Sequence, residues 1–130
     1  MASNGKVALV TGGGSGIGKA SALALAREGF AVVVAGRRPE PLNAVVGEIE
    51  AMQGKALGVP TDVGDPASVE TLFAQTKSTF GRLDVLFNNA GFGAAGLIED
   101  LPFDKWMGVV GSIVNGTFLC TQQALSLIHI

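Results

Sequence analysis

Apolar residues occur in short runs along the chain, and these runs alternate with longer segments in which apolar residues recur every three or four positions. The short runs are rich in β-branched residues and bounded by glycine, proline and aspartate, which is typical of strands buried on both faces of a parallel sheet. The longer segments have the spacing of amphipathic helices. The predicted strands lie at residues 6–11, 30–35, 56–59 and 83–87, and the predicted helices at 17–28, 39–53, 65–80 and from 103 to the late 120s.

Turn and cap residues support this alternation. Gly29, Gly54 and Gly81 each follow a predicted helix, where a glycine commonly ends one. Asp65 and Pro66 suit the N-cap and the first helical position of the third helix. The repeated strand–helix order predicts the α/β class, with a Rossmann-like doubly wound parallel sheet of about four strands and flanking helices.

A glycine-rich turn, TGGGSGIG, connects the first predicted strand to the first predicted helix. Glycines in such a turn let the backbone approach a pyrophosphate, and the helix N-terminus presents free N–H groups to the anion. An ordinary tight turn is the alternative, but the position between a strand and an amphipathic helix favours dinucleotide binding. The residues predicted to contact the cofactor here are Thr11, Gly12, Gly14, Ser15, Gly16, Ile17 and Gly18.

A second motif, Asn88–Gly91 (NNAG), directly follows the fourth predicted strand. With both motifs the chain resembles the short-chain dehydrogenase/reductase family, which carries Thr-Gly-x-x-x-Gly-x-Gly after its first strand and Asn-Asn-Ala-Gly after its fourth. The resemblance extends to about residue 125. It implies an NAD(P)-dependent oxidoreductase that transfers hydride to or from a carbonyl or alcohol carbon. It also implies that Asn89, Ala90 and Gly91 line the cofactor site.

Two further positions bear on the cofactor. The resemblance implies that Asp62 and Val63 meet the adenine ring, while a turn aspartate before Gly64 is the alternative. Arg37 and Arg38 follow the second strand, where an NAD-binding enzyme usually places an acid for the ribose 2′-OH. Basic residues there accommodate a 2′-phosphate, so we expect NADP, with NAD as the alternative cofactor. The other interpretation of these arginines is a solvated pair of surface charges.

The catalytic residues of the family are expected to be missing. Family members use a tyrosine with a lysine four residues later, a serine and an asparagine, and this chain contains no tyrosine. The register set by Gly116 places Ile113 at the family's asparagine position, whereas Asn115 falls roughly 200° around the helix. We therefore expect no catalytic residue here, and residues 1–130 to form an NAD(P)-binding domain that is incomplete at its C-terminus.

The last residues, Ser126–Ile130, depart from the basic residues that the family usually shows as this helix ends. We interpret them as a frame or read-through artefact at a truncation, with a native apolar helix end as the alternative. His129, the only histidine, is therefore given no functional role.

Composition narrows the remaining function classes. Hydrophobic residues make up 48% and charged residues 15%, which excludes a disordered chain. The net charge of −2 provides no basic surface for nucleic acid. No apolar run approaches the roughly 18 residues of a membrane span, and no signal peptide is visible. A single cysteine, Cys120, fits a reducing compartment, so a cytoplasmic protein without a metal site is expected.

The sequence leaves the final assignment between two classes. The favoured one is the cofactor-binding part of an oxidoreductase whose complete form takes a small carbonyl or alcohol substrate and forms a homo-oligomer. The alternative is a dinucleotide-binding or structural module without turnover. A methyltransferase is disfavoured because it explains neither Asn88–Gly91 nor the arginine pair.

Overall fold

The computed structural model describes residues 2–128 and contains one parallel sheet with the strand order β3-β2-β1-β4. The strands are β1 (Val7–Thr11), β2 (Ala31–Gly36), β3 (Ala56–Pro60) and β4 (Val85–Phe87). The helices are α1 (Gly16–Arg27), α2 (Pro39–Ala51), α3 (Pro66–Phe80), the 3-10 turn η1 (Ile98–Asp100), α4 (Phe103–Val110), the π-helical segment η2 (Gly111–Asn115) and α5 (Gly116–Ile128). The predicted Rossmann-like parallel sheet is thereby confirmed.

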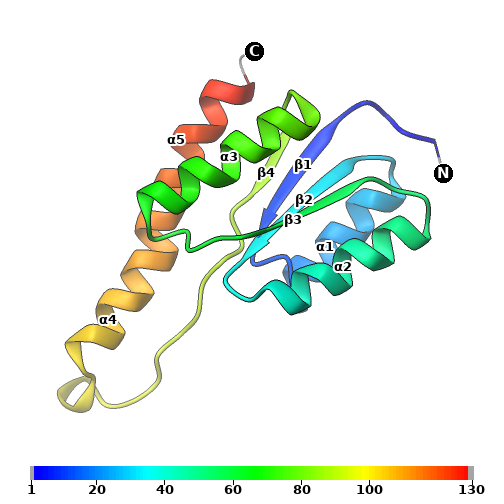
Figure 1. Cartoon of the computed structure of the whole chain (residues 1–130). Coiled ribbons are helices and arrows are strands. Elements are labelled where there is room, and N and C mark those ends of the chain that lie inside the picture. The colour runs from blue at the N-terminus through cyan, green and yellow to red at the C-terminus, as the bar shows by residue number, and fades with distance from the viewer. Residues whose placement is uncertain (1, 129–130) are drawn as a thin grey trace.

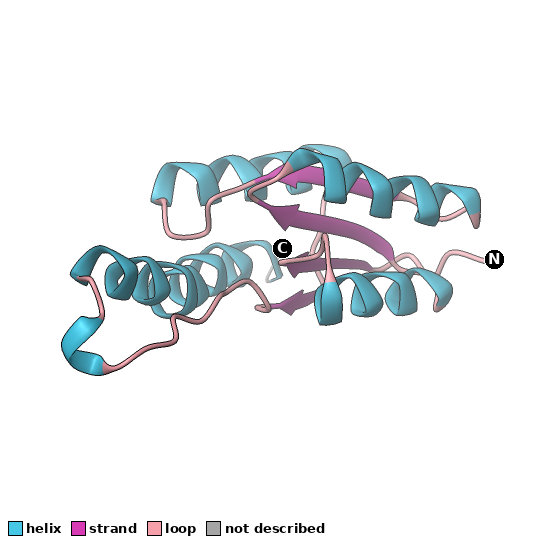
Figure 2. Ribbon diagram, turned by 90° about the horizontal axis from the view of Figure 1, so that it is seen from below, coloured by secondary structure: helices cyan, strands magenta, loops and turns pink. Residues whose placement is uncertain are grey.

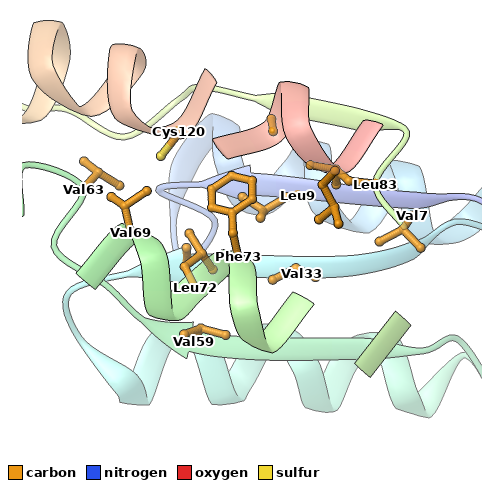
Figure 3. Packing of buried hydrophobic residues seen from close by; sticks show 13 residues of the cluster. Val7, Leu9, Val33, Val59, Val63, Val69, Leu72, Phe73, Leu83 and Cys120 are labelled. Carbon is orange, nitrogen blue, oxygen red and sulfur yellow. The ribbon is translucent and has the colours of Figure 1, made fainter. Parts of the chain in front are cut away.

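Helices cover both faces of the sheet: α1 and α2 lie together on one side, and α3 and α5 on the other (Figure 1). Alternate strand residues therefore point into two different cores. Leu9 and Val33 belong to the core under α3 and α5, where Phe73 of α3 packs (Figure 3). Val10 and Val34 belong to the core under α1 and α2. Because both faces are buried, the strands are apolar without alternation.

Most predicted helix ends are confirmed. The Asp65 carboxylate accepts a hydrogen bond from the Ala67 N–H at 3.1 Å and so caps the start of α3. Gly81 ends that helix with a left-handed φ of +78°, and its N–H donates to the Lys77 carbonyl at 2.8 Å. Gly29 ends α1 in the same left-handed region, with φ +92°. A residue with a Cβ would be strained at either glycine.

The end of α2 differs from the prediction. The helix ends at Ala51, and the left-handed conformation falls on Gln53, with φ +67°, rather than on the expected Gly54. The Gly54 N–H donates to the Ile49 carbonyl at 2.9 Å, which completes the hydrogen-bonding pattern of a Schellman motif. Gly54 is required for space, because a Cβ there would lie 2.8 Å from Cγ2 of Ile49.

The predicted fourth strand, 83–87, is shorter in the structure, yet its start is attached to β1 by a side chain. The Asp84 carboxylate accepts the Val7 N–H at 2.9 Å, while the Asp84 N–H donates to the Val7 carbonyl at 2.8 Å. Arg82 holds the same carboxylate with two hydrogen bonds and thereby lowers the pKa of Asp84. The aspartate thus takes over the backbone pairing where the regular strand has not yet begun.

The last predicted helix, from 103 to the late 120s, is helical at every residue from 103 to 128, but it contains a π-helical turn that the sequence did not predict. The π-helical turn η2 separates α4 from α5. Together with the loop before it, α4 extends away from the sheet (Figures 1 and 2). Several large apolar side chains on α4, η2 and α5 are consequently exposed, among them Trp106 at 52%, Val114 at 60% and Phe118 at 62%. Within residues 2–128, no helix has the length and apolar character needed to cross a membrane.

Candidate functional site

The carboxyl ends of the parallel strands meet at one edge of the sheet and enclose a cleft of about 370 Å³. Open α/β sheets bind their ligands at this edge. The site residues predicted from the sequence that line the cleft are Gly12, Gly14, Ser15, Arg37, Arg38, Asp62, Val63, Ala90 and Gly91. The lining residues that the sequence reasoning missed are Gly36, Pro41, Leu42, Thr61, Phe92 and Ser112.

The glycine-rich turn is shaped by steric limits that the structure makes explicit. Gly12 and Gly16 have φ of +66° and +54°, a region that side chains with a Cβ rarely adopt. A Cβ on Gly18 would collide with the Gly12 carbonyl and the Asn89 side chain. By contrast, no atom lies within 4 Å of a Cβ built on Gly16, among the described residues. Packing therefore explains Gly18, whereas the turn at Gly16 is left open to an approaching ligand.

Of the residues predicted to contact the cofactor, Gly16, Ile17 and Gly18 do not line the cleft, and neither do Thr11 and Asn89. The Thr11 hydroxyl is buried and accepts the N–H groups of Asn89 and Ala90 at 3.0 and 2.9 Å. The Asn89 side-chain amide donates to the Gly12 carbonyl at 3.3 Å. These contacts join the glycine-rich turn to the Asn-Asn-Ala-Gly segment. Both residues therefore hold in place the segments that line the cleft without lining it themselves.

The N-terminus of α1 faces the cleft without a side-chain cap. Ser15 occupies the N-cap position but makes no capping hydrogen bond, and the first turn contains no acidic residue. Ile17, the second residue of α1, is 73% exposed. The first-turn N–H groups and the helix dipole therefore favour an anion at this point.

Arg37 and Arg38 follow β2 and are exposed at the cleft. In the part of the chain that the structure describes, neither arginine forms an ion pair. The guanidinium of Arg37 lies over the ring of Phe92, 5.2 Å from its centroid. Asp62 is the one carboxylate among the described lining residues, so the positive charge of the arginines dominates this end of the cleft.

Asp62 and Val63 combine a structural role with a place in the cleft. The Asp62 carboxylate accepts the Gly64 N–H at 3.0 Å, so Asp62 does stabilise the turn before Gly64, as the alternative interpretation proposed. Its own N–H donates to the Ser68 hydroxyl at 2.9 Å. Val63 is 6% exposed, and a Cβ on Gly116 would lie 2.7 Å from its Cγ2. Both residues still border the cleft after β3.

Ile113 lies beside the Asn-Asn-Ala-Gly segment. A Cβ on Gly91 would come within 2.9 Å of the Ile113 Cγ1, so the two residues are in close contact. Ser112, its neighbour in η2, lines the cleft, whereas Asn115 does not. His129 lies outside the described residues. Cys120 is a buried core residue, and its burial raises the pKa of the thiol to about 11.

Comparison with known proteins gives consistent results. The family model described as short chain dehydrogenase matches residues 6–129. The chain is 40% identical over 125 residues to a 3beta-hydroxysteroid dehydrogenase from Mediterraneibacter gnavus, covering 95% of this chain and 45% of that protein. It is 41% identical over 116 residues to a cyclohexanol dehydrogenase from Acinetobacter sp., covering 88% and 46% of the two chains.

A solved structure extends the likeness to the fold. The crystal structure of a short chain dehydrogenase from Burkholderia cenocepacia in complex with NADP superposes with a TM-score of 0.91 at 37% identity. The superposition covers 95% of this chain and 51% of that one. The chain thus spans about half the length of the curated relatives and solved structures that it matches.

Proposed function

Because the chain belongs to the short chain dehydrogenase family, we propose that it binds NADP in the cleft at the carboxyl edge of its sheet. We further propose that residues 1–130 are the cofactor-binding part of an oxidoreductase acting on alcohols or carbonyl compounds. The observation that carries this proposal is the arrangement of that edge, where an uncapped helix N-terminus and two arginines border one cleft.

The cleft residues fit a dinucleotide by their chemistry. The turn from Gly12 to Gly18, open at Gly16, would hold the pyrophosphate against the first-turn N–H groups of α1. Asp62 and Val63 would border the adenine ring, and Ala90 and Gly91 would form the opposite wall. Thr11 and Asn89 would act indirectly, since their polar groups already hold the two walls together.

The preference for NADP over NAD rests on the residues that follow β2. A bound NAD would gain from an acid that accepts its ribose 2′-OH, but Gly36, Arg37 and Arg38 occupy this place. One charge-assisted hydrogen bond contributes roughly 1.5–3 kcal/mol, which corresponds to about a tenfold to hundredfold difference in affinity. The lack of an ion-pair partner for either arginine, within residues 2–128, leaves their donors available to a 2′-phosphate.

The cofactor would donate or accept the hydride, and the chain's own residues would bind and orient the cofactor. Proton transfer in this family uses a tyrosine, and the 130 residues include none. Ile113, which contacts Gly91, offers no hydrogen-bonding group at the position where we place the family's asparagine. We therefore propose that the chain alone has no dehydrogenase turnover, and absorbance assays with NADP and a panel of alcohols would detect any such activity.

A second candidate function is a dinucleotide-binding module without turnover, and Ile113 at the family's asparagine position favours it. In either case the proposed partner is a small molecule, not nucleic acid or a membrane. We also propose a homo-oligomer for the complete enzyme, since apolar side chains of α4 and α5 are exposed. A reducing, cytoplasmic compartment is supported by the single cysteine.

Calorimetric titration with NADP and NAD tests the proposed preference. Replacing Arg37 and Arg38 together by alanine should weaken NADP binding by roughly tenfold or more and leave NAD binding nearly unchanged. Arg27→Ala, at the far end of α1, removes a charge outside the cleft and should change neither affinity. An equal loss for both cofactors would assign the arginine pair to the pyrophosphate or to folding instead.

A further inference from the structure

We propose that Phe92 is a positioning residue for Arg37, and that its ring holds the guanidinium ready for the 2′-phosphate of an adenosine ligand. This inference rests on the proposed function, because it concerns how the cleft selects that phosphate. The observation behind it is the cation–π contact between the two side chains, with the Arg37 Cζ over the Phe92 ring, 5.2 Å from its centroid.

The pair connects two loops that are distant in the sequence. Arg37 follows β2 and Phe92 lies beyond β4, and these strands flank β1 on opposite sides. Both side chains line the cleft whose floor is the turn after β1. The contact between the two side chains therefore joins the loops that follow the two neighbours of β1.

The ring has a defined position of its own. A Cβ on Gly108 of α4 would lie 3.2 Å from the Phe92 Cζ, so the ring is in contact with α4 at a residue without a side chain. Phe92 is 40% exposed, so part of its surface remains open to solvent. Through this contact α4 supports the ring over which the Arg37 guanidinium lies.

The contact with the ring leaves the arginine able to bind a phosphate. A guanidinium contacts an aromatic ring with its flat face, while its five N–H donors point outward in its own plane. The donors of Arg37 have no ion-pair partner in the described part of the chain, and the Asp62 carboxylate is engaged by the Gly64 N–H. A bidentate interaction with a phosphate is thus compatible with the contact to the ring. Without the ring, the arginine would lose more side-chain entropy when it binds.

The test compares two small ligands that differ only in the 2′-phosphate, 2′,5′-ADP and 5′-ADP, by calorimetric titration of the full 130-residue chain. A cation–π contact at an exposed site corresponds to about a twofold to fivefold change in affinity. Phe92→Leu should therefore weaken 2′,5′-ADP binding by about twofold to fivefold and leave 5′-ADP binding unchanged. Phe92→Tyr keeps an aromatic face and should retain the wild-type ratio of the two affinities.

Controls separate this role from a structural one. Phe103→Leu makes the same change at an exposed phenylalanine of α4 that does not line the cleft, and it should leave both affinities unchanged. In an Arg37→Ala background, Phe92→Leu should have no further effect on the ratio. Thermal melts establish that each variant is folded, and Phe92→Met serves in place of Phe92→Leu if the latter does not fold.

Each outcome decides between the two proposals. Unchanged or tighter 2′,5′-ADP binding by Phe92→Leu, or an equal loss for both ligands, overturns the role of Phe92. If Arg37→Ala still lowers 2′,5′-ADP binding selectively, the NADP proposal survives that failure. A wild-type chain that binds both ligands equally overturns the NADP preference and the role of Phe92 together.

Discussion

Removing the Thr11 hydroxyl should destabilise the connection between the glycine-rich turn and the Asn-Asn-Ala-Gly segment. The hydroxyl accepts the N–H groups of Asn89 and Ala90 and lies 3.4 Å from the Phe87 carbonyl, to which it donates. Thr11→Val keeps the shape of the side chain and leaves both amides without this acceptor. An unpaired buried amide costs about 1–3 kcal/mol, and both hydrogen bonds are only partly buried, so we expect a loss of about 2 kcal/mol in unfolding free energy.

Urea unfolding followed by circular dichroism measures this loss. With a slope of about 1–3 kcal/mol per molar urea, a change of about 2 kcal/mol moves the midpoint by roughly 1 M. The matched control is Thr76→Val, because Thr76 is as buried as Thr11 and its hydroxyl only donates to the Leu72 carbonyl within α3. That change removes one hydrogen bond but leaves no donor unpaired, so it should cost about 1 kcal/mol or less. If Thr11→Val is as stable as Thr76→Val, the Thr11 hydroxyl does not connect the glycine-rich turn to the Asn-Asn-Ala-Gly segment in the way we propose.

Three further predictions concern the rest of the molecule. Cys120 is buried, and burial raises the pKa of its thiol to about 11. At neutral pH a thiol reagent should therefore label it only when local or global unfolding exposes it, and the labelling rate should rise steeply in urea. The Arg82 hydrogen bond lowers the pKa of Asp84 in the folded state, so the stability that Asp84 contributes is present above its unfolded-state pKa and is lost as the pH falls through its folded-state pKa. Asp84→Asn should therefore make the unfolding free energy less dependent on pH in the acid range. An unchanged pH dependence would contradict this. The exposed apolar residues of α4 and α5 should make the chain associate, which light scattering after size exclusion would detect, and Phe118→Ser should reduce it; a monodisperse monomer at all concentrations would disprove the expectation.

Local sequence signals predicted the parts of the fold that depend on local chemistry. Gly29, Asp65 and Gly81 end or begin helices as expected, because a left-handed turn or an N-cap depends on a few adjacent residues. Gln53 escaped prediction because its left-handed conformation is imposed by hydrogen bonds of the helix end on a residue with no intrinsic preference for it. The π-helical turn η2 likewise has no signal in an apolar helix pattern that continues through it.

The candidate site was predictable where it follows strand ends and unpredictable where it depends on packing between distant segments. Arg37 and Ala90 line the cleft as expected, because the carboxyl ends of parallel strands meet at one edge. Phe92 and Ser112 were missed, since their positions depend on how α4 and η2 lie against the sheet. Thr11 belongs to a familiar motif, yet only the structure reveals that its hydroxyl is used for the protein's own amides.

Backbone amide NMR spectra of the chain titrated with NADP test the central claim most directly, because they locate the ligand on the molecule. We expect chemical-shift changes along the turn from Gly12 to Gly18 and at Arg37, Asp62 and Gly91, which lie at the carboxyl edge of the sheet. Lys55, at the opposite edge, should not change. Changes confined to α4 and α5, or a spectrum unaltered by excess NADP, would contradict the assignment of the cleft as a dinucleotide site.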